Sequence, residues 1–138
     1  MKSNYKAMVL SCIDPRFQPV VYNYLKKKKL IGKYSSFTIA GAAVGVTANR
    51  FKKWHKTFWD NLDTSIKLHN IKKLIVINHC DCGAAKIING NKEFSTYNEK
   101  QIHWESFKKI KYIFKKKYPK LNIELIIISL NGKIDKYK

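Results

Sequence analysis

Arginine and acidic residues are scarce in this chain, and their scarcity limits what its strong positive charge can mean. The 138 residues contain 28 Lys plus Arg against 9 Asp plus Glu, which gives a formal net charge of +19. Arg16 and Arg50 are the only arginines. Arginine is the side chain best suited to two-pronged contacts with phosphate groups and base edges. We therefore expect a solvated lysine surface rather than a nucleic-acid partner.

Long apolar runs and a charged-then-apolar leader are also missing. No stretch approaches the roughly 20 apolar residues needed to cross a bilayer, and Met1 to Lys6 are largely polar. We therefore predict a cytoplasmic protein with no membrane partner. The hydrophobic content of 45% and aromatic content of 13% exclude a disordered or fibrous class. The length fits a single domain, 1–138, whose core needs no disulfides.

Short apolar runs alternate with segments of helical spacing. This pattern predicts strands at 6–12, 35–40, 74–78 and 123–130, and helices at 17–31, 54–68 and 99–118. Because the strands are apolar on both faces, we expect an α/β fold with a mainly parallel β-sheet flanked by helices. In such folds ligands gather at the carboxyl ends of the strands. Cys12 and His79 each stand at such an end.

Cysteine occurs only at positions 12, 80 and 82, an odd number that predicts metal or redox chemistry rather than a disulfide framework. Cys12, His79 and Cys82 together offer two thiolates and one imidazole, a set that zinc prefers. Three protein ligands leave a fourth position open, as in catalytic zinc sites. A tight turn, eased by Gly83, can return Cys82 to the side of His79.

The residues alone leave other interpretations of these cysteines open. A cysteine at a strand end is often a small buried hydrophobic residue, which would make Cys12 a bystander. Cys80 and Cys82 can then act as a C-x-C pair by themselves.

Two motifs resemble those of the β-carbonic anhydrase family. Residues 11–17, SCIDPRF, are similar to its CxDxR motif, and residues 78–86, NHCDCGAAK, are similar to its HxxCG segment. Residues 38–41, TIAG, stand where the family has a segment like RNAG, and residues 126–132 resemble its final strand and turn. The likeness keeps the family's order over nearly the whole chain, which would be a small, minimal member.

The resemblance implies three sets of site residues. They are the Zn²⁺ ligands Cys12, His79 and Cys82, the catalytic pair Asp14 and Arg16, and the substrate contacts Gly41, Ala42 and Gly83. Physical chemistry also favours the pair, because a carboxylate can accept a hydrogen bond from a metal-bound water while a guanidinium holds it in place. In some family members the aspartate moves onto the metal and closes the site. A plain Asp-Pro turn is the alternative use of that dipeptide.

The implied activity is the reversible hydration of carbon dioxide to bicarbonate by a homo-oligomer, a dimer or larger. Hydrolysis of carbonyl sulfide or carbon disulfide would need the same hydroxide and is an alternative. Two further hypotheses are an inactive zinc-binding protein that binds a partner or nucleic acid through its lysine surface, and a redox or metal-buffering protein that uses Cys80 and Cys82.

Some positions depart from the family pattern or have no assigned role. Thr38 and Ile39 replace the arginine and asparagine of the RNAG segment, and Cys80 is an addition. The remaining histidines fall in predicted helices without partners at ligand spacing, so we expect them at the surface; proton transfer by one of them is the alternative. They are His55, His69 and His103.

Overall fold

A computed structural model describes residues 5–138, so residues 1–4 of the predicted domain lie outside the described part. The strands are β1 (Ala7–Ser11), β2 (Tyr34–Thr38), β3 (Lys73–His79), β4 (Asn122–Ile128) and β5 (Ile134–Lys136). The helices are α1 (Gln18–Lys27), α2 (Ala43–Thr47), α3 (His55–His69), α4 (Gly83–Asn89) and α5 (Thr96–Lys117), with 3-10 turns at η1 (Pro15–Phe17) and η2 (Asn49–Trp54).

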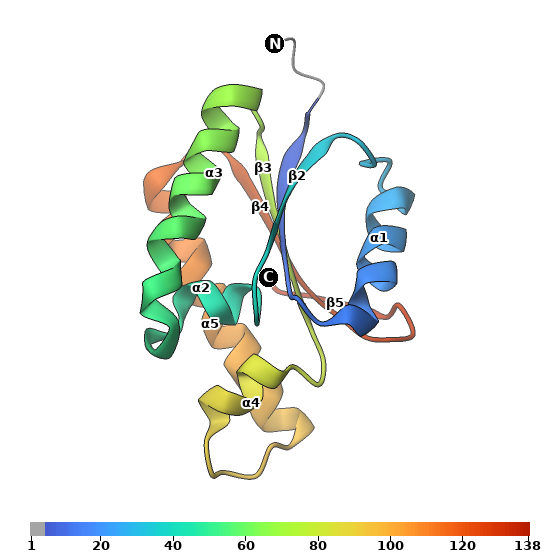
Figure 1. Ribbon diagram of the computed structural model, residues 1–138, viewed down its shortest axis with the longest axis vertical. Helices are drawn as coiled ribbons and strands as arrows, with labels where there is room; N and C mark the ends of the chain where they lie inside the picture. Colours follow the sequence, from blue (N-terminus) through green and yellow to red (C-terminus); the bar gives the residue numbers. More distant parts are fainter. Residues whose placement is uncertain (1–4) are drawn as a thin grey trace.

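Within residues 5–138 the strands form one sheet in the order β2-β1-β3-β4-β5. Strands β1 to β4 pair in parallel, and β5 adds an antiparallel edge. Helix α1 covers one face of the sheet, while α2, α3 and α5 lie on the other (Figure 1). The predicted α/β fold with a mainly parallel, helix-flanked sheet is confirmed. The sequence does not predict β5, because a three-residue strand carries no measurable periodicity.

Alternating side chains divide the core into two layers. Odd-numbered residues of β1 and β3, such as Val9 and Ile75, pack with Leu25 beneath α1. Even-numbered residues such as Leu10 and Val76 pack on the opposite side, against α3 and α5. Both faces of each central strand are thus buried, as expected for a parallel sheet under helices.

Some element ends differ from the predicted ones for local reasons. Helix α5 begins at Thr96 rather than at 99, because the Ser95 hydroxyl accepts the Asn98 N–H and caps the helix. Helix α1 ends at Lys27 rather than at 31, and Lys29 then takes a left-handed φ of 61°. The short helices α2 and α4 are rich in small residues and lack the apolar spacing that predicts a helix.

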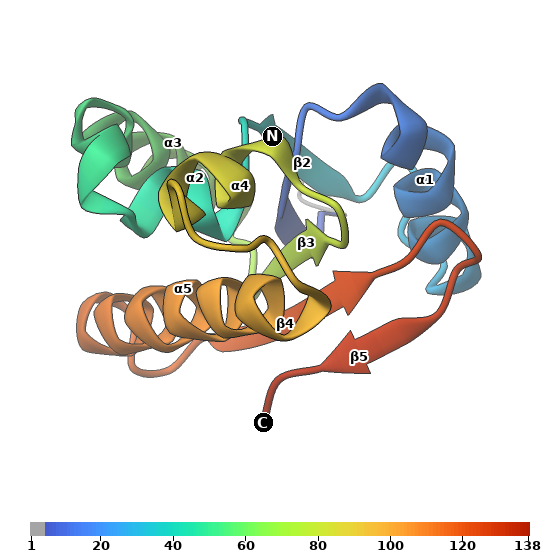
Figure 2. The ribbon, with the colours of Figure 1, turned by 90° about the horizontal axis from the view of Figure 1, so that it is seen from below.

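The neighbouring strands β1 and β3 end at the same edge of the sheet, where Ser11 pairs with Ile77. Helix α4 lies just beyond this edge, at the foot of the molecule in Figure 1 and toward the viewer in Figure 2. The segments that follow β1 and β3 therefore come together beside α4.

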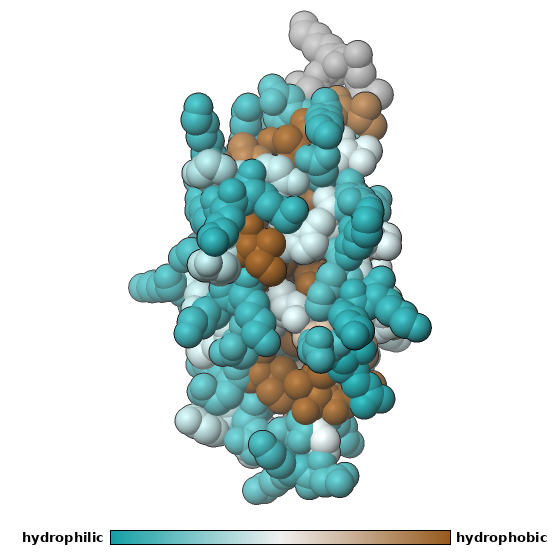
Figure 3. Space-filling model, turned by 90° about the vertical axis from the view of Figure 1, so that its left-hand side faces the viewer, coloured by the Kyte–Doolittle hydropathy of each residue, from teal (hydrophilic) through white to brown (hydrophobic). Residues whose placement is uncertain are grey.

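The surface on the α3 side is mostly hydrophilic, with separate apolar patches between the charged side chains (Figure 3). Among residues 5–138, no helix has the length and apolar character that a membrane crossing would need.

The Glu124 carboxylate of β4 links α1 to the sheet through hydrogen bonds and an ion pair. One oxygen of the Glu124 carboxylate accepts hydrogen bonds from the Tyr24 hydroxyl and from the Lys28 ammonium, which lies 3.0 Å away. The Lys73 ammonium lies 3.0 Å from the other oxygen of the same carboxylate. Burial alone would raise the pKa of Glu124, but these partners outweigh it and lower the pKa to about 2.

We expect Glu124→Gln to lower the free energy of unfolding at pH 7 by about 2 kcal/mol, because it removes charge-assisted hydrogen bonds from a nearly buried group. The folded pKa lies below the ordinary value of 4.5, so this contribution is complete above pH 4.5 and is lost as the pH falls toward 2. Urea unfolding of both proteins between pH 7 and pH 2.5 measures the effect. Asp60→Asn, in the exposed pair with Lys56, is the control and should change little. A difference in the free energy of unfolding between the parent and Glu124→Gln that stays constant over this pH range would contradict the lowered pKa of Glu124.

Candidate metal centre

Cys12, His79 and Cys82 meet at the carboxyl edge of the sheet. Cys12 follows β1, His79 ends β3 and Cys82 precedes α4. The potential ligand atoms of the three residues all lie within 4.8 Å of one another, and all three residues are buried. Within the described part of the chain, this is the group of side chains that could hold a metal ion.

The imidazole of His79 is oriented for metal binding. Its Nδ1 lies 2.7 Å from the Cys80 carbonyl oxygen. Because a carbonyl only accepts, Nδ1 carries a proton, so Nε2 is the ring nitrogen available to a metal ion. This Nε2 is buried and has no hydrogen-bond partner among residues 5–138. The Phe17 ring stacks on the imidazole at a centroid distance of 4.1 Å and holds its plane. A buried nitrogen without a partner is costly, and a cation bound between the thiols would satisfy it.

The two thiols are poised to share a proton in the absence of metal. The contact with Cys82 lowers the pKa of Cys12 despite its burial, with help from His79 and the Gly41 N–H. That amide lies 3.3 Å from the Cys12 sulfur. The same contact between the thiols, together with burial, raises the pKa of Cys82. A divalent cation would displace the remaining proton and leave two thiolates.

Gly41 can reach the sulfur only because it lacks a side chain. Its φ is +79°, and a Cβ at this position would lie 2.7 Å from the Cβ of Ala84. An amino acid with a side chain would therefore push the 41–43 segment away from the thiol.

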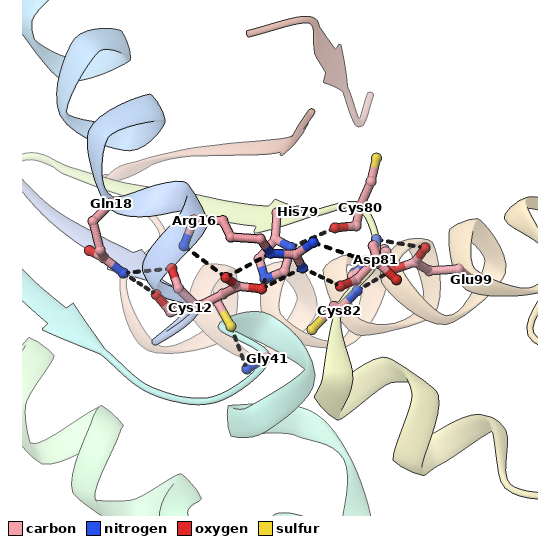
Figure 4. A network of polar contacts seen from close by, with 11 residues as sticks. Cys12, Arg16, Gln18, Gly41, His79, Cys80, Asp81, Cys82 and Glu99 are labelled. Atoms are coloured by element: carbon pink, nitrogen blue, oxygen red, sulfur yellow. Dashed lines mark hydrogen bonds and ion pairs between the residues drawn. The ribbon is translucent and has the colours of Figure 1, made fainter. Parts of the chain in front are cut away.

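The turn between His79 and Cys82 depends on Asp81 rather than on Gly83. Asp81 adopts a left-handed φ of 58°, whereas Gly83 is the first residue of α4. The expectation that Gly83 eases this turn is wrong. Asp81 reverses the chain, so Cys82 points toward Cys12, whereas the sulfur of Cys80 points away from both thiols (Figure 4). Cys80 is exposed, and its sulfur lies 3.5 Å from the Ser129 hydroxyl.

Arg16 joins the two metal-binding segments from the outside. Its Nε and one terminal nitrogen donate to the two oxygens of Asp14, at 3.1 and 2.7 Å. The other terminal nitrogen donates to the Asp81 carboxylate at 3.0 Å. The contact between Arg16 and Asp81 is drawn in Figure 4. The guanidinium lowers the pKa of Asp14 to about 2, so this carboxylate is ionised at neutral pH. One of its oxygens lies 3.8 Å from the His79 Nε2.

A hollow of about 320 Å³ opens beside these groups. It is lined by Cys12, Ile13, Asp14, Pro15, Ala40, Gly41, Gly83 and Ala84. Two of the predicted substrate contacts, Gly41 and Gly83, thus lie on its wall. Ala42 does not line it, because its side chain is fully buried in the core on the α3 side of the sheet. We therefore no longer expect Ala42 to contact a substrate.

Glu99 of α5 holds the backbone of the His79–Cys82 turn on the side that faces the protein interior. No sequence motif singles out this residue. Its carboxylate accepts the Asp81 N–H at 3.0 Å and the Cys82 N–H at 2.8 Å, and the His103 Nε2 lies 3.2 Å away. Burial alone would raise the pKa of Glu99, but the hydrogen bonds from His103 and from the two amides lower it below its ordinary value.

His103 is buried, so the prediction of a surface position for it is wrong. Its Nδ1 lies 2.8 Å from the side-chain nitrogen of Asn78. That nitrogen also donates to the Ser106 hydroxyl at 3.3 Å, while the Asn78 oxygen accepts the Ala43 N–H at 3.0 Å. The i, i+4 spacing of Glu99 and His103 on one helix face is the sequence signal that could have found this pair.

The other two histidines are half-buried rather than exposed. The His55 Nε2 lies 3.0 Å from the Ala48 carbonyl oxygen. The His69 ring packs edge-on against Tyr5, with ring centroids 4.4 Å apart. Both contacts lie outside the cysteine-histidine group.

Comparison with known proteins agrees with this geometry. A family model described as "Putative carbonic anhydrase" matches residues 1–137. The chain belongs to this carbonic anhydrase family. A relative from Rickettsia bellii, described as an uncharacterized protein, is 29% identical over 129 residues, which cover 93% of this chain and 79% of the relative.

Solved β-carbonic anhydrases share the fold of this family member. The enzyme CafA of Aspergillus fumigatus superimposes with a TM-score of 0.68 at 10% identity, over 99% of this chain and 76% of that one. A structure described as one of two tetrameric β-carbonic anhydrases from Sordaria macrospora gives a TM-score of 0.58 at 9% identity, over 97% of this chain and 81% of that one. The expected resemblance to the β-carbonic anhydrase family is thus confirmed.

We expect Cys12→Ser and Cys82→Ser to lose bound zinc, and Cys80→Ser to retain it, because only the first two sulfurs face the His79 Nε2. Elemental analysis of protein purified with zinc and dialysed against a weak chelator measures the content. Cys80→Ser is the matched control for losing a thiol from the same segment. A folded Cys12→Ser protein with the same zinc content as the parent would show that this assignment of ligands is wrong.

Proposed function

We propose that this chain is a zinc-dependent carbonic anhydrase that hydrates carbon dioxide reversibly to bicarbonate. The observation that carries the proposal is a buried sulfur-nitrogen-sulfur set, with an unpaired imidazole nitrogen, beside an open hollow that holds an ionised carboxylate. Membership of the carbonic anhydrase family supports it.

Cys12, His79 and Cys82 would hold the zinc ion. The donor set suits zinc better than calcium or magnesium, which prefer oxygen ligands. Zinc supplies the Lewis acidity that makes a hydroxide nucleophile available from water near neutral pH. The protein contributes an imidazole fixed by the Cys80 carbonyl and the Phe17 ring, and two converging thiols.

Asp14 would orient the nucleophile. Because the Arg16 guanidinium engages both of its oxygens, the carboxylate stays ionised and accepts a hydrogen bond from the attacking water. Arg16 also holds Asp14 at the rim of the hollow, with one carboxylate oxygen 3.8 Å from the His79 Nε2. In this role Arg16 is a positioning residue, and a lysine cannot reproduce its two-pronged contact.

The hollow suits a small, linear, weakly polar substrate. Gly41, Ala40 and Ala84 present little more than backbone and methyl groups toward it. Carbonyl sulfide and carbon disulfide are linear molecules like carbon dioxide, so both should be tested as alternative substrates.

We also propose that the protein acts as a homo-oligomer. The hollow opens at the surface beside Ile13, an apolar side chain that is 58% exposed at its rim. A second copy placed there would cover this side chain and narrow the entrance. The cytoplasmic location and the absence of a nucleic-acid partner stay predictions.

Stopped-flow measurement of carbon dioxide hydration, on protein of known zinc content, tests the proposed reaction. We expect activity at pH 7 and a higher rate at pH 9, because two thiolates make the metal's water less acidic than neutral ligands do. Activity at pH 9 alone would indicate closure by Asp14. Zinc-loaded protein without hydration at both pH values would refute the proposal and favour an inactive zinc-binding protein. Hydrolysis of carbon disulfide or carbonyl sulfide in place of hydration would reassign the substrate.

We expect Asp14→Asn to lower kcat/KM by about 100-fold, because the amide cannot accept hydrogen bonds as a carboxylate does. Arg16→Lys should lower it by about 10- to 100-fold, as expected when support for a reacting group is lost. Arg50→Lys, at the other arginine and on the exposed surface, is the control and should keep the rate. Zinc content should be unchanged in all three variants. An Asp14→Asn enzyme with the parental rate would remove Asp14 from the mechanism.

A further inference from the structure

The contacts of α5 point to a role for Glu99 that the family resemblance does not supply. We propose that Glu99, oriented by His103, is the positioning residue that holds the His79–Cys82 turn in its metal-binding shape. This inference rests on the zinc site of the proposed function, and it adds a support built on the inner side of that site.

The first step is the choice of partners. Glu99 accepts the backbone N–H groups of Asp81 and Cys82, at 3.0 and 2.8 Å. Asp81 is the residue with left-handed φ that reverses the chain. Two successive amides are thus tied to a single carboxylate, which determines the direction in which the Cys82 thiol leaves the turn.

The second step is the burial of the carboxylate. Glu99 is 8% exposed and His103 is 1% exposed. In such surroundings hydrogen bonds are stronger than in water, and an unsatisfied partner is correspondingly costly. The turn therefore cannot leave Glu99 without leaving buried polar groups unpaired.

The third step is the direction of the hydrogen bonds. From Ala43 through Asn78 and His103 to Glu99, each contact determines which group donates in the next one. The Ala43 N–H donates to the oxygen of Asn78, so the nitrogen of that amide faces His103. An amide nitrogen only donates, so the His103 Nδ1 must accept and its Nε2 must carry the proton. That proton is then donated to Glu99.

It follows that position 99 must accept at both oxygens. One oxygen faces the Asp81 N–H, and the other faces both the Cys82 N–H and the His103 Nε2–H. A glutamine side chain of the same shape would place its NH₂ group against at least one of these donors in either orientation. Only a carboxylate satisfies every donor.

The same chain of hydrogen bonds reaches two segments around the metal site, residues 78–82 and residues 41–43. Asn78 precedes the ligand His79, and the Ala43 amide lies two residues beyond Gly41, whose own amide contacts the Cys12 sulfur. Helix α5 therefore holds the turn directly and the 41–43 segment through Asn78. The buried network provides a support in the region where Thr38 and Ile39 replace the arginine and asparagine of the family pattern.

Glu99→Gln tests this role, with Glu105→Gln as the control. Glu105 lies on the same helix and is exposed, so its substitution makes the same charge change without touching the turn. We expect the zinc dissociation constant of Glu99→Gln, from competition with a chelator, to rise about 10- to 100-fold, as for other groups that orient metal ligands. The visible absorption of the cobalt-substituted protein should also change. The control should match the parent in both measurements.

A Glu99→Gln protein that folds, binds zinc as tightly as the parent and gives the parental cobalt spectrum would overturn the inference. If the variant does not fold, amide hydrogen exchange on the unchanged protein decides. The Asp81 and Cys82 amides should be protected, and exchange at the rate of exposed turn amides would equally overturn it. Zinc affinity, the cobalt spectrum and amide exchange do not depend on catalysis. If the zinc-loaded parent protein does not hydrate carbon dioxide, the proposed reaction is refuted, but these three measurements still test the role of Glu99.

Discussion

The buried Nε2 of His79 and the two converging sulfurs set the main constraint on this structure. Polar atoms withdrawn from water need partners, yet this nitrogen makes no hydrogen bond of normal geometry within residues 5–138 and lies among the two sulfurs, with an Asp14 oxygen 3.8 Å away. The parallel sheet creates the situation, because β1 and β3 are neighbours and end at the same edge. A metal cation is a partner that suits two thiols and an imidazole nitrogen.

Two kinds of support surround this cluster, and they differ in exposure. On the outer side, Arg16 joins Asp14 to Asp81 through contacts at the surface, where water weakens ion pairs. On the inner side, Glu99 and His103 make hydrogen bonds that are shielded from water. The first arrangement suits the role proposed for Asp14 beside a reacting water, and the second suits the proposed role of Glu99 in holding the turn.

Several features of the fold and the site follow from particular residues of the sequence. The runs around Val9 and Ile75 are apolar on both faces, and only a sheet covered by helices on both sides buries such strands. Cys12 and His79 stand at strand ends, which places them at one edge. The resemblance of SCIDPRF and NHCDCGAAK to family motifs then favours Cys82 over Cys80 as a ligand, a choice that spacing alone does not make.

Other features were decided only by tertiary structure, because they depend on contacts between segments far apart in the chain. The left-handed φ of Asp81 turns Cys82 inward and leaves Cys80 exposed. The spacing of His103 from Phe107 and Ile110 places it on the buried face of α5, but its contact with Asn78 of β3 depends on how the helix packs against the sheet. Ala42 likewise lies in the core on the α3 side of the sheet, although its neighbour Gly41 lines the hollow. The sequence by itself determined the strand pattern and the candidate ligands, whereas long-range packing decided which side chains face the site.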